Sequence, residues 1–152
     1  MASSNINHFV CKYQMSDHRK PPLPPHYETA PEGTCRWCNV PIGLTKTGKP
    51  SKSRWHPICV KEYKFLFWPA TTRREVWKRD KGKCNSCGIV CEKKGPQGWD
   101  LDHITPLIEG TGDLSFWQMG NLQTLCKPCH KEKTSREATE RAAKRREAKK
   151  SE

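Results

Sequence analysis

The chain has 152 residues, of which 34% are hydrophobic and 29% charged, and its 28 lysines and arginines against 16 acidic residues give a net charge of +12. The hydrophobic fraction lies below the roughly 45–50% of a typical globular domain, so a large apolar core is excluded. No apolar run is long enough to cross a membrane, and the N-terminus lacks the pattern of a secretory signal. The positive charge favours a polyanionic partner, most simply nucleic acid.

Composition divides the chain into four segments. Residues 1–31 contain a proline-rich stretch and few core-forming residues, which predicts a disordered N-terminal tail. Residues 32–70 hold a first metal-type cluster, and residues 71–135 hold a second cluster together with the candidate chemistry. Residues 136–152 are highly charged and are predicted to form a basic helix or tail.

Nine cysteines and six histidines offer another means of holding the fold together. Without a secretory signal, paired cysteines indicate metal sites rather than disulfides. The first group consists of two closely spaced pairs of the ligand types that tetrahedral zinc takes. These ligands are Cys35, Cys38, His56 and Cys59. The loop between the pairs is basic and contains no acid, so we predict that it contacts phosphates. Its basic residues are Lys46, Lys49, Lys52 and Arg54.

The second group of ligands gives the strongest metal signal in the chain. It consists of two Cys-x-x-Cys pairs, Cys84 with Cys87 and Cys126 with Cys129. Gly88 directly after the first pair is typical of a zinc knuckle. A site of four thiolates is closed, so this zinc is expected to fold the domain rather than to catalyse. We interpret Cys11 and Cys91 as free thiols or packing residues.

A helix is predicted to lead into the second cluster. The run from Thr72 to Glu75 matches a capping box, and Gly82 is suited to end the helix. Its basic residues either touch the DNA backbone or remain solvated. They are Arg73, Arg74, Lys78 and Arg79, of which we select Arg73 and Arg74 as candidate DNA contacts.

The segment between the thiolate pairs predicts two strands and a helix. Alternation from Trp99 indicates a strand that ends near Asp102 and His103. A return strand over residues 121–126 follows, and Pro128 is placed to start a helix with His130 in its first turn. Adjacent strand residues point to opposite faces, so Asp102 and His103 serve one site only if the strand ends or bulges there, or if they flank a scissile phosphate. The acids Asp100, Glu109 and Asp113 are interpreted as turn or surface residues.

Taken together, these residues resemble the HNH endonuclease family over roughly residues 71–135. The matching elements are Cys84-x-x-Cys87, Asp102-His103, Asn121 and Leu125-Cys126-x-x-Cys129-His130. The upstream cluster looks like a module that precedes HNH domains in some proteins, with His56 where cysteine is often expected. The resemblance implies an α+β fold, in which a small zinc-stapled ββα-metal, treble-clef-like nuclease core follows an N-terminal zinc module.

The resemblance also implies metal-dependent hydrolysis of DNA phosphodiester bonds, leaving a 3′-hydroxyl and a 5′-phosphate. His103 would act as the general base, a role that suits a near-neutral imidazole. Asp102 and His130 would bind one Mg²⁺ or Mn²⁺, although an imidazole also admits Ni²⁺ or Co²⁺. Asn121 would hold the His103 loop, and two zinc ions would be structural.

Two rival functions remain open from the sequence. The first is a non-catalytic, zinc-stapled module that binds nucleic acid; the complete set of candidate catalytic residues argues against it. The second is a RING-like protein-interaction module, but such modules interleave their ligand pairs, whereas the ligand pairs here are sequential. We expect DNA as partner, no membrane, a monomer or weak homodimer, and an intracellular location (cytoplasm or nucleoid, or nucleus in a eukaryote).

Overall fold

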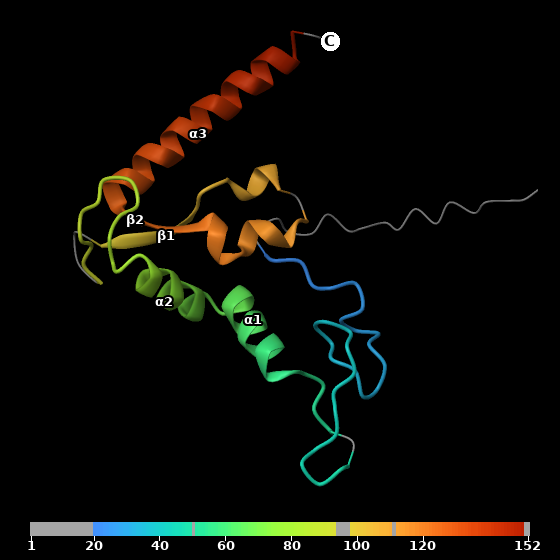
Figure 1. The fold of residues 1–152 in the computed structure, drawn as a ribbon. Coiled ribbons are helices and arrows are strands. Elements are labelled where there is room, and N and C mark those ends of the chain that lie inside the picture. Colours follow the sequence, from blue (N-terminus) through green and yellow to red (C-terminus); the bar gives the residue numbers. More distant parts are fainter. Residues whose placement is uncertain (1–19, 50, 94–97, 111, 151–152) are drawn as a thin grey trace, which may run out of the picture.

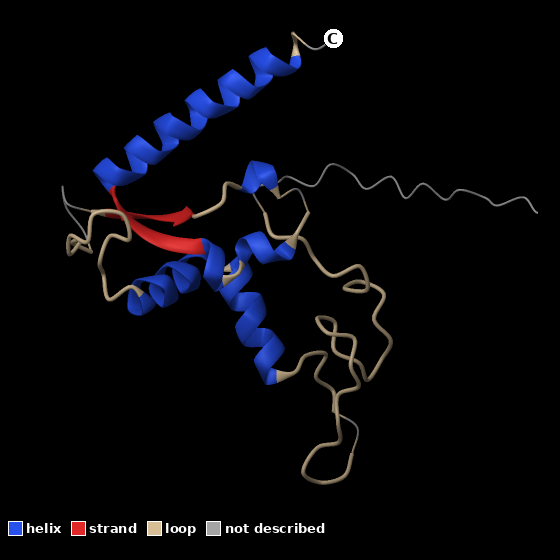
Figure 2. Cartoon of the chain, turned by 45° about the horizontal axis from the view of Figure 1, so that its top comes forward, coloured by secondary structure: helices blue, strands red, loops and turns tan. Residues whose placement is uncertain are grey.

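The computed structural model describes residues 20–49, 51–93, 98–110 and 112–150, and the predictions for Cys11 and most of the N-terminal tail lie outside them. The regular elements are α1 (Pro57–Phe67), α2 (Pro69–Arg79), β1 (Trp99–His103), β2 (Leu122–Cys126) and α3 (Lys127–Ala148). Three short 3₁₀ helices connect the strands: η1 (Leu107–Glu109), η2 (Leu114–Trp117) and η3 (Met119–Asn121). Helices α1 and α2 lie on one side of the hairpin and α3 lies on the other (Figure 1 and Figure 2). The predicted small α+β fold is confirmed.

The two strands form an antiparallel hairpin whose faces carry different chemistry. The register pairs Trp99 with Cys126 and His103 with Leu122. Trp99 packs against Trp77 of α2, with ring centroids 4.8 Å apart. Because side chains alternate along a strand, Asp100 and Asp102 point the other way, towards α3. The hairpin therefore presents an apolar face to α2 and an acidic face to α3.

Helix α2 begins one turn earlier than the capping-box pattern predicted, so that prediction is wrong. Trp68 is the N-terminal cap residue, and Pro69 occupies the first turn, where its missing N–H costs nothing. The Thr72 hydroxyl lies inside the helix and donates to the carbonyl oxygens of Phe65 and Trp68, which ties α2 to the end of α1. The predicted end is confirmed: Gly82 has a φ of +68° and its N–H bonds to the Trp77 carbonyl.

Two arginines of α2 bind backbone carbonyl groups of the hairpin. The Arg73 guanidinium lies 4.1 Å from the centroid of the Trp99 ring and donates to the Trp99 carbonyl. Arg79 donates to the carbonyl oxygens of Met119 and Leu122. These arginines fasten α2 to both strands of the hairpin, because a strand end leaves carbonyl groups without ladder partners.

Two small cores lie around the two cysteine clusters. The core of the hairpin consists of Cys84, Cys91, Trp99, Leu125 and Cys126. Cys91 is 5% exposed and is thus a packing residue, one of the two interpretations given to it. The second core is aromatic, and Trp37, Trp55, Tyr63 and Phe67 contact one another within it.

The residues just before the first cluster take part in the second core. Tyr27 stacks on Tyr63, and Ala30 is 6% exposed. Both residues lie on the tail side of the predicted boundary at residue 31. The three predicted boundaries between the four segments stay predictions.

Helix α3 starts at the second cysteine cluster and continues well past the sheet. A proline in its first turn, at the predicted position, opens the helix. None of its residues is buried, and its C-terminal half projects away from the rest of the molecule (Figure 1). Within the described residues, no helix combines the length and apolar character that a membrane crossing requires.

Candidate active site and metal centres

Each predicted zinc tetrad comes together in space. The ligand atoms of Cys35, Cys38, His56 and Cys59 all lie within 4.8 Å of one another, and so do those of Cys84, Cys87, Cys126 and Cys129. The Sγ atoms of Cys87 and Cys126 are 3.8 Å apart, which is close to the edge of a tetrahedron with Zn–S bonds of about 2.3 Å. Both clusters can therefore hold a zinc ion.

The two clusters share one architecture. In each, a tight knuckle supplies the first ligand pair, and the N-terminus of a helix supplies the second. His56 and Cys126 are the cap residues of α1 and α3, and each is followed by a proline within the first helical turn. Both knuckles turn through a residue of positive φ, Asn39 (+56°) and Gly88 (+75°). Gly88 was predicted from the sequence, whereas Asn39 was not, because asparagine also occurs in many other backbone conformations and so does not by itself indicate a positive φ.

The orientation of His56 suits a zinc ligand. Its Nδ1 lies 3.4 Å from the Cys38 Sγ, and its Nε2 lies 3.2 Å from the Pro41 carbonyl oxygen. A ligating histidine commonly donates its other ring N–H to such a carbonyl, which fixes the tautomer. Histidine can thus replace a fourth cysteine in this cluster.

The pKa values of two cysteine thiols in the first cluster are shifted in opposite directions. Burial acts to raise the pKa of Cys35, but N–H donors from Cys38, His56 and Trp37 outweigh it and lower the pKa to about 6. Burial and the neighbouring thiols instead raise the pKa of Cys59 to about 12. The three sulfurs of this cluster can all be thiolates only around a cation, since a coordinating metal deprotonates them.

The candidate catalytic metal ligands meet between β1 and α3. The Asp102 Oδ1 lies 3.7 Å from the His130 Nε2, too far for a hydrogen bond but within the span of two ligands on one ion with bonds of about 2.0–2.2 Å. The other ring nitrogen of His130, Nδ1, is 3.1 Å from the Asp100 Oδ2. The sequence analysis interpreted Asp100 as a turn or surface acid, but it lies on a strand and faces His130.

The second oxygen of Asp102 is already engaged by the protein. Its Oδ2 accepts from the Gln123 amide at 2.8 Å and lies 3.0 Å from the Lys133 ammonium group. Lys133 also donates to the His103 carbonyl at 2.8 Å and pairs with Glu137, and its side chain is only 13% exposed. Lys133 and Gln123 therefore fix the carboxylate so that Oδ1 faces His130.

His103 lies at the end of β1 on the face opposite to Asp102. Its ring meets the Trp117 ring edge-on, with centroids 5.0 Å apart. Burial lowers its pKa below the ordinary histidine value, and the positive charge of Lys133 acts in the same direction against the opposing effect of Asp102. The Nε2 atom is buried without a hydrogen-bond partner, one of two such side-chain atoms among the described residues. An imidazole kept only for structure would have that atom satisfied.

Asn121 joins the two ends of the loop that follows His103. Its side-chain oxygen accepts from the Thr105 N–H at 2.8 Å, and its amide group donates to the carbonyl oxygens of Thr105 and Phe116. Its own carbonyl accepts from the Ile104 N–H. These are the contacts that an orienting residue requires.

The predicted phosphate contacts do not gather at this site. The loop containing Lys46, Lys49 and Lys52 is exposed and lies at the far end of the molecule from the hairpin (Figure 1 and Figure 2). Arg54 donates to the Ala30 carbonyl. Arg74 is exposed and pairs with its neighbour Glu75.

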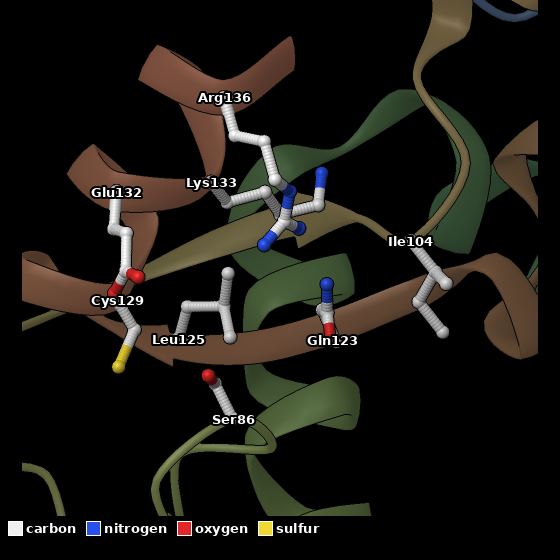
Figure 3. Close-up of a pocket in the computed structure, with 8 residues that line it drawn as sticks. All are labelled: Ser86, Ile104, Gln123, Leu125, Cys129, Glu132, Lys133 and Arg136. Carbon is white, nitrogen blue, oxygen red and sulfur yellow. The ribbon is translucent and has the colours of Figure 1, made fainter.

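A pocket of about 270 Å³ lies between β2 and α3, and its lining includes Gln123 and Lys133, the two partners of Asp102. The side chains of Lys133 and Arg136 reach from α3 towards β2, where Gln123 lies (Figure 3). Arg136 is 63% exposed, lies 3.9 Å from Glu140, and adds a positive charge to the pocket that Lys133 and Gln123 also line. The sequence analysis missed Arg136, because its place three residues after Lys133 in a charged helix carries no signal of its own.

The amino-acid sequence is similar to those of known proteins over the region that contains the candidate site. The profile described as HNH endonuclease matches residues 84–136. A probable HNH endonuclease of Lactococcus phage SK1 is 40% identical over 96 residues, covering 60% of this chain and 81% of the phage protein. The DNA annealing helicase and endonuclease ZRANB3 is 50% identical in Homo sapiens over 50 residues and 52% identical in Mus musculus over 48 residues.

These ZRANB3 matches cover 33% and 32% of this chain but only 4% of either mammalian protein. No solved structure matches this chain significantly. The match to the phage protein extends over most of that protein's length, and the profile covers the hairpin, the four-cysteine cluster and the start of α3. The chain therefore belongs to the HNH endonuclease family.

Proposed function

We propose that this protein hydrolyses phosphodiester bonds in DNA, with His103 as the general base and one divalent metal ion held by Asp102 and His130. The observation that carries the proposal is the position of two groups at the end of β1. The Nε2 of His103 has no hydrogen-bond partner, and the Asp102 Oδ1 faces His130 with only a long contact of 3.4 Å to Lys133. Mg²⁺ or Mn²⁺ suits a carboxylate oxygen with a single imidazole. When bound, the metal would polarise the phosphate and stabilise the leaving oxygen.

The protein groups have separate tasks in this proposal. His103 accepts the proton of the attacking water, and the lowered pKa leaves its imidazole neutral and ready to do so at pH 7. Asn121 holds the backbone just after His103 and so orients the ring. The strand separates His103 from Asp102, but β1 ends there, so a phosphate can lie across its end between the two side chains.

Nicking of supercoiled plasmid tests this function. Wild-type protein with verified zinc content is expected to nick with Mg²⁺ or Mn²⁺ and to stop without either ion. Asp102→Asn is expected to lower the rate about 10²-fold or more, because it removes the charge that the metal needs. Asp113→Asn is the matched control, since Asp113 only caps Ser115 at the surface. Nicking that persists in Asp102→Asn would refute the metal site.

We also propose that Asp100 positions the His130 ring by accepting from Nδ1, which leaves Nε2 for the metal. Loss of such an outer partner typically costs 10–100-fold in metal affinity. Asp100→Ala is therefore expected to weaken Mn²⁺ binding by about that factor, measured by electron paramagnetic resonance. Asp100→Asn keeps an acceptor oxygen and should recover part of the affinity.

The tautomer of the His130 imidazole provides a second test of the role proposed for Asp100. Nitrogen-15 spectra of the zinc-loaded protein without Mg²⁺ or Mn²⁺ should show a fixed His130 tautomer in the wild type and a mixture in Asp100→Ala. Asp113→Ala again serves as the control. Equal Mn²⁺ affinity and equal spectra for wild type and Asp100→Ala would contradict the positioning role.

The zinc tetrads and DNA contacts complete the proposal. Both tetrads would bind structural zinc, and Arg136 would add a phosphate contact near the site. Other proposed phosphate contacts are Lys46, Lys49, Lys52, Arg54, Arg73 and Arg74. Arg73 and Arg54 would have to exchange their present partners for phosphate, so they are the weakest of this set. We propose an intracellular place of action and a monomer or weak homodimer, and the rival function is binding without cleavage.

A further inference from the structure

We infer that the groove between α1 and α2 binds an unpaired nucleotide of the DNA, with a base stacked on Trp68. The inference rests on the proposed function, because it supplies a second contact for the same substrate. The groove has a volume of about 560 Å³, within the roughly 300–1,000 Å³ typical of ligand clefts. The two helices that supply its lining lie on the side of the hairpin opposite to α3 (Figure 1). Its lining consists of Lys61, Lys64, Phe65, Trp68, Thr71, Arg74 and Glu75.

Trp68 has an exposed aromatic ring on a backbone that both helices hold in place. Its side chain is 51% exposed, whereas Trp37 and Trp99 are nearly buried. Its backbone is fixed by both helices, because its N–H bonds to the Lys64 carbonyl and its carbonyl accepts from the N–H groups of Thr71 and Thr72. Stacking of a base on this ring therefore costs little conformational entropy of the protein backbone.

The charge around Trp68 suits a phosphate. The Lys64 ammonium lies over one face of the Trp68 ring, 4.9 Å from its centroid, so a base would stack on the other face. The one acid in the lining, Glu75, is offset by Arg74 at 3.0 Å and Lys78 at 3.6 Å. A basic groove beside an exposed aromatic ring is the arrangement by which proteins hold single strands, since the ring takes the base and the cations take the backbone.

An unpaired base is favoured over duplex DNA by the ring itself. A duplex hides the faces of its bases in the stack, so it would use the lysines and leave the indole without a partner. Stacking on an aromatic side chain is worth about 1–3 kcal/mol per base, or roughly 5–100-fold in affinity. The groove therefore predicts tighter binding to single-stranded or partly unpaired DNA than to blunt duplex.

Fluorescence anisotropy with labelled oligonucleotides tests this inference, using the full chain without added divalent metal. Trp68→Ala is expected to lose roughly 5–100-fold of its affinity for a single strand and less than about 2-fold for a blunt duplex. Trp68→Phe keeps a π face and should retain most of the binding. Lys64→Ala should weaken single-strand binding, whereas Lys144→Ala, an exposed lysine of α3, should do so less.

Three outcomes would contradict the inference that this groove binds an unpaired nucleotide. One is wild-type affinity for single strands in a correctly folded Trp68→Ala, judged by zinc content and circular dichroism. Another is an equal loss for single strand and duplex. A third is binding of labelled polyglutamate that depends on Trp68 while DNA binding does not, which would assign the groove to an acidic protein. Binding is measured apart from nicking, so a chain that uses Trp68 but never cleaves would refute the proposed function and leave the groove intact.

Discussion

Replacement of His103 by alanine is expected to lower plasmid nicking by about 10²–10⁴-fold, the usual contribution of a general base. DNA affinity should change little, because the half-buried ring packs against Trp117 and offers no charge to the backbone. The measurement is the initial nicking rate with saturating Mg²⁺ or Mn²⁺, on samples matched for zinc content. His103→Gln gives a second variant that keeps a polar side chain of similar length.

A histidine far from the hairpin supplies the control for this experiment. His26 contacts the Trp37 carbonyl in the aromatic core, so His26→Gln can keep a donor there and should nick as the wild type does. Equal nicking by wild type and His103→Ala would show either that another group takes the proton or that a contaminant cleaves. Loss of nicking together with loss of zinc would instead mean that the core had unfolded.

Loss of the zinc at the second cluster is expected to unfold the nuclease core. Structural zinc contributes about 10–16 kcal/mol in small zinc domains, as much as the 5–15 kcal/mol by which a whole domain is usually stable. Cys84→Ser should therefore yield a protein with one zinc instead of two and no cooperative unfolding transition for the hairpin. Elemental analysis and thermal denaturation measure these two effects.

Cys91 provides a close comparison for Cys84. Both thiols are buried in the same small core, but only Cys84 belongs to the tetrad. Cys91→Ser should keep both zinc ions and lose only about 1–3 kcal/mol, the cost of burying a hydroxyl without a good partner. A zinc lost from Cys91→Ser but retained in Cys84→Ser would show that the tetrad is assigned wrongly.

The sequence predicted the local features of this protein well. The hairpin, the start of α3 and the end of α2 each depend on residues close together in the chain, and such short-range patterns are governed by backbone geometry. The predicted zinc ligands come together in two clusters, and their binding of zinc stays a prediction. The HNH family resemblance came from the order and spacing of these same features. The start of α2 was misplaced because Thr72 to Glu75 matches a capping box as well inside a helix as at its end.

Only the tertiary structure decided which charged side chains contact one another at the candidate site. Asp100 meets His130 and Lys133 meets Asp102 across about thirty residues, and Arg73 and Arg79 reach strand carbonyls over 26 to 43 residues. Nothing local distinguishes these groups from surface charges. They become partners because the hairpin turns its acidic face to α3 and its apolar face to α2, and side-chain alternation then determines which charges meet. The sequence by itself determined the cysteine and histidine pairs that come together in two clusters and the likeness to HNH nucleases, whereas packing of helices on both faces decided which charged residues contact one another.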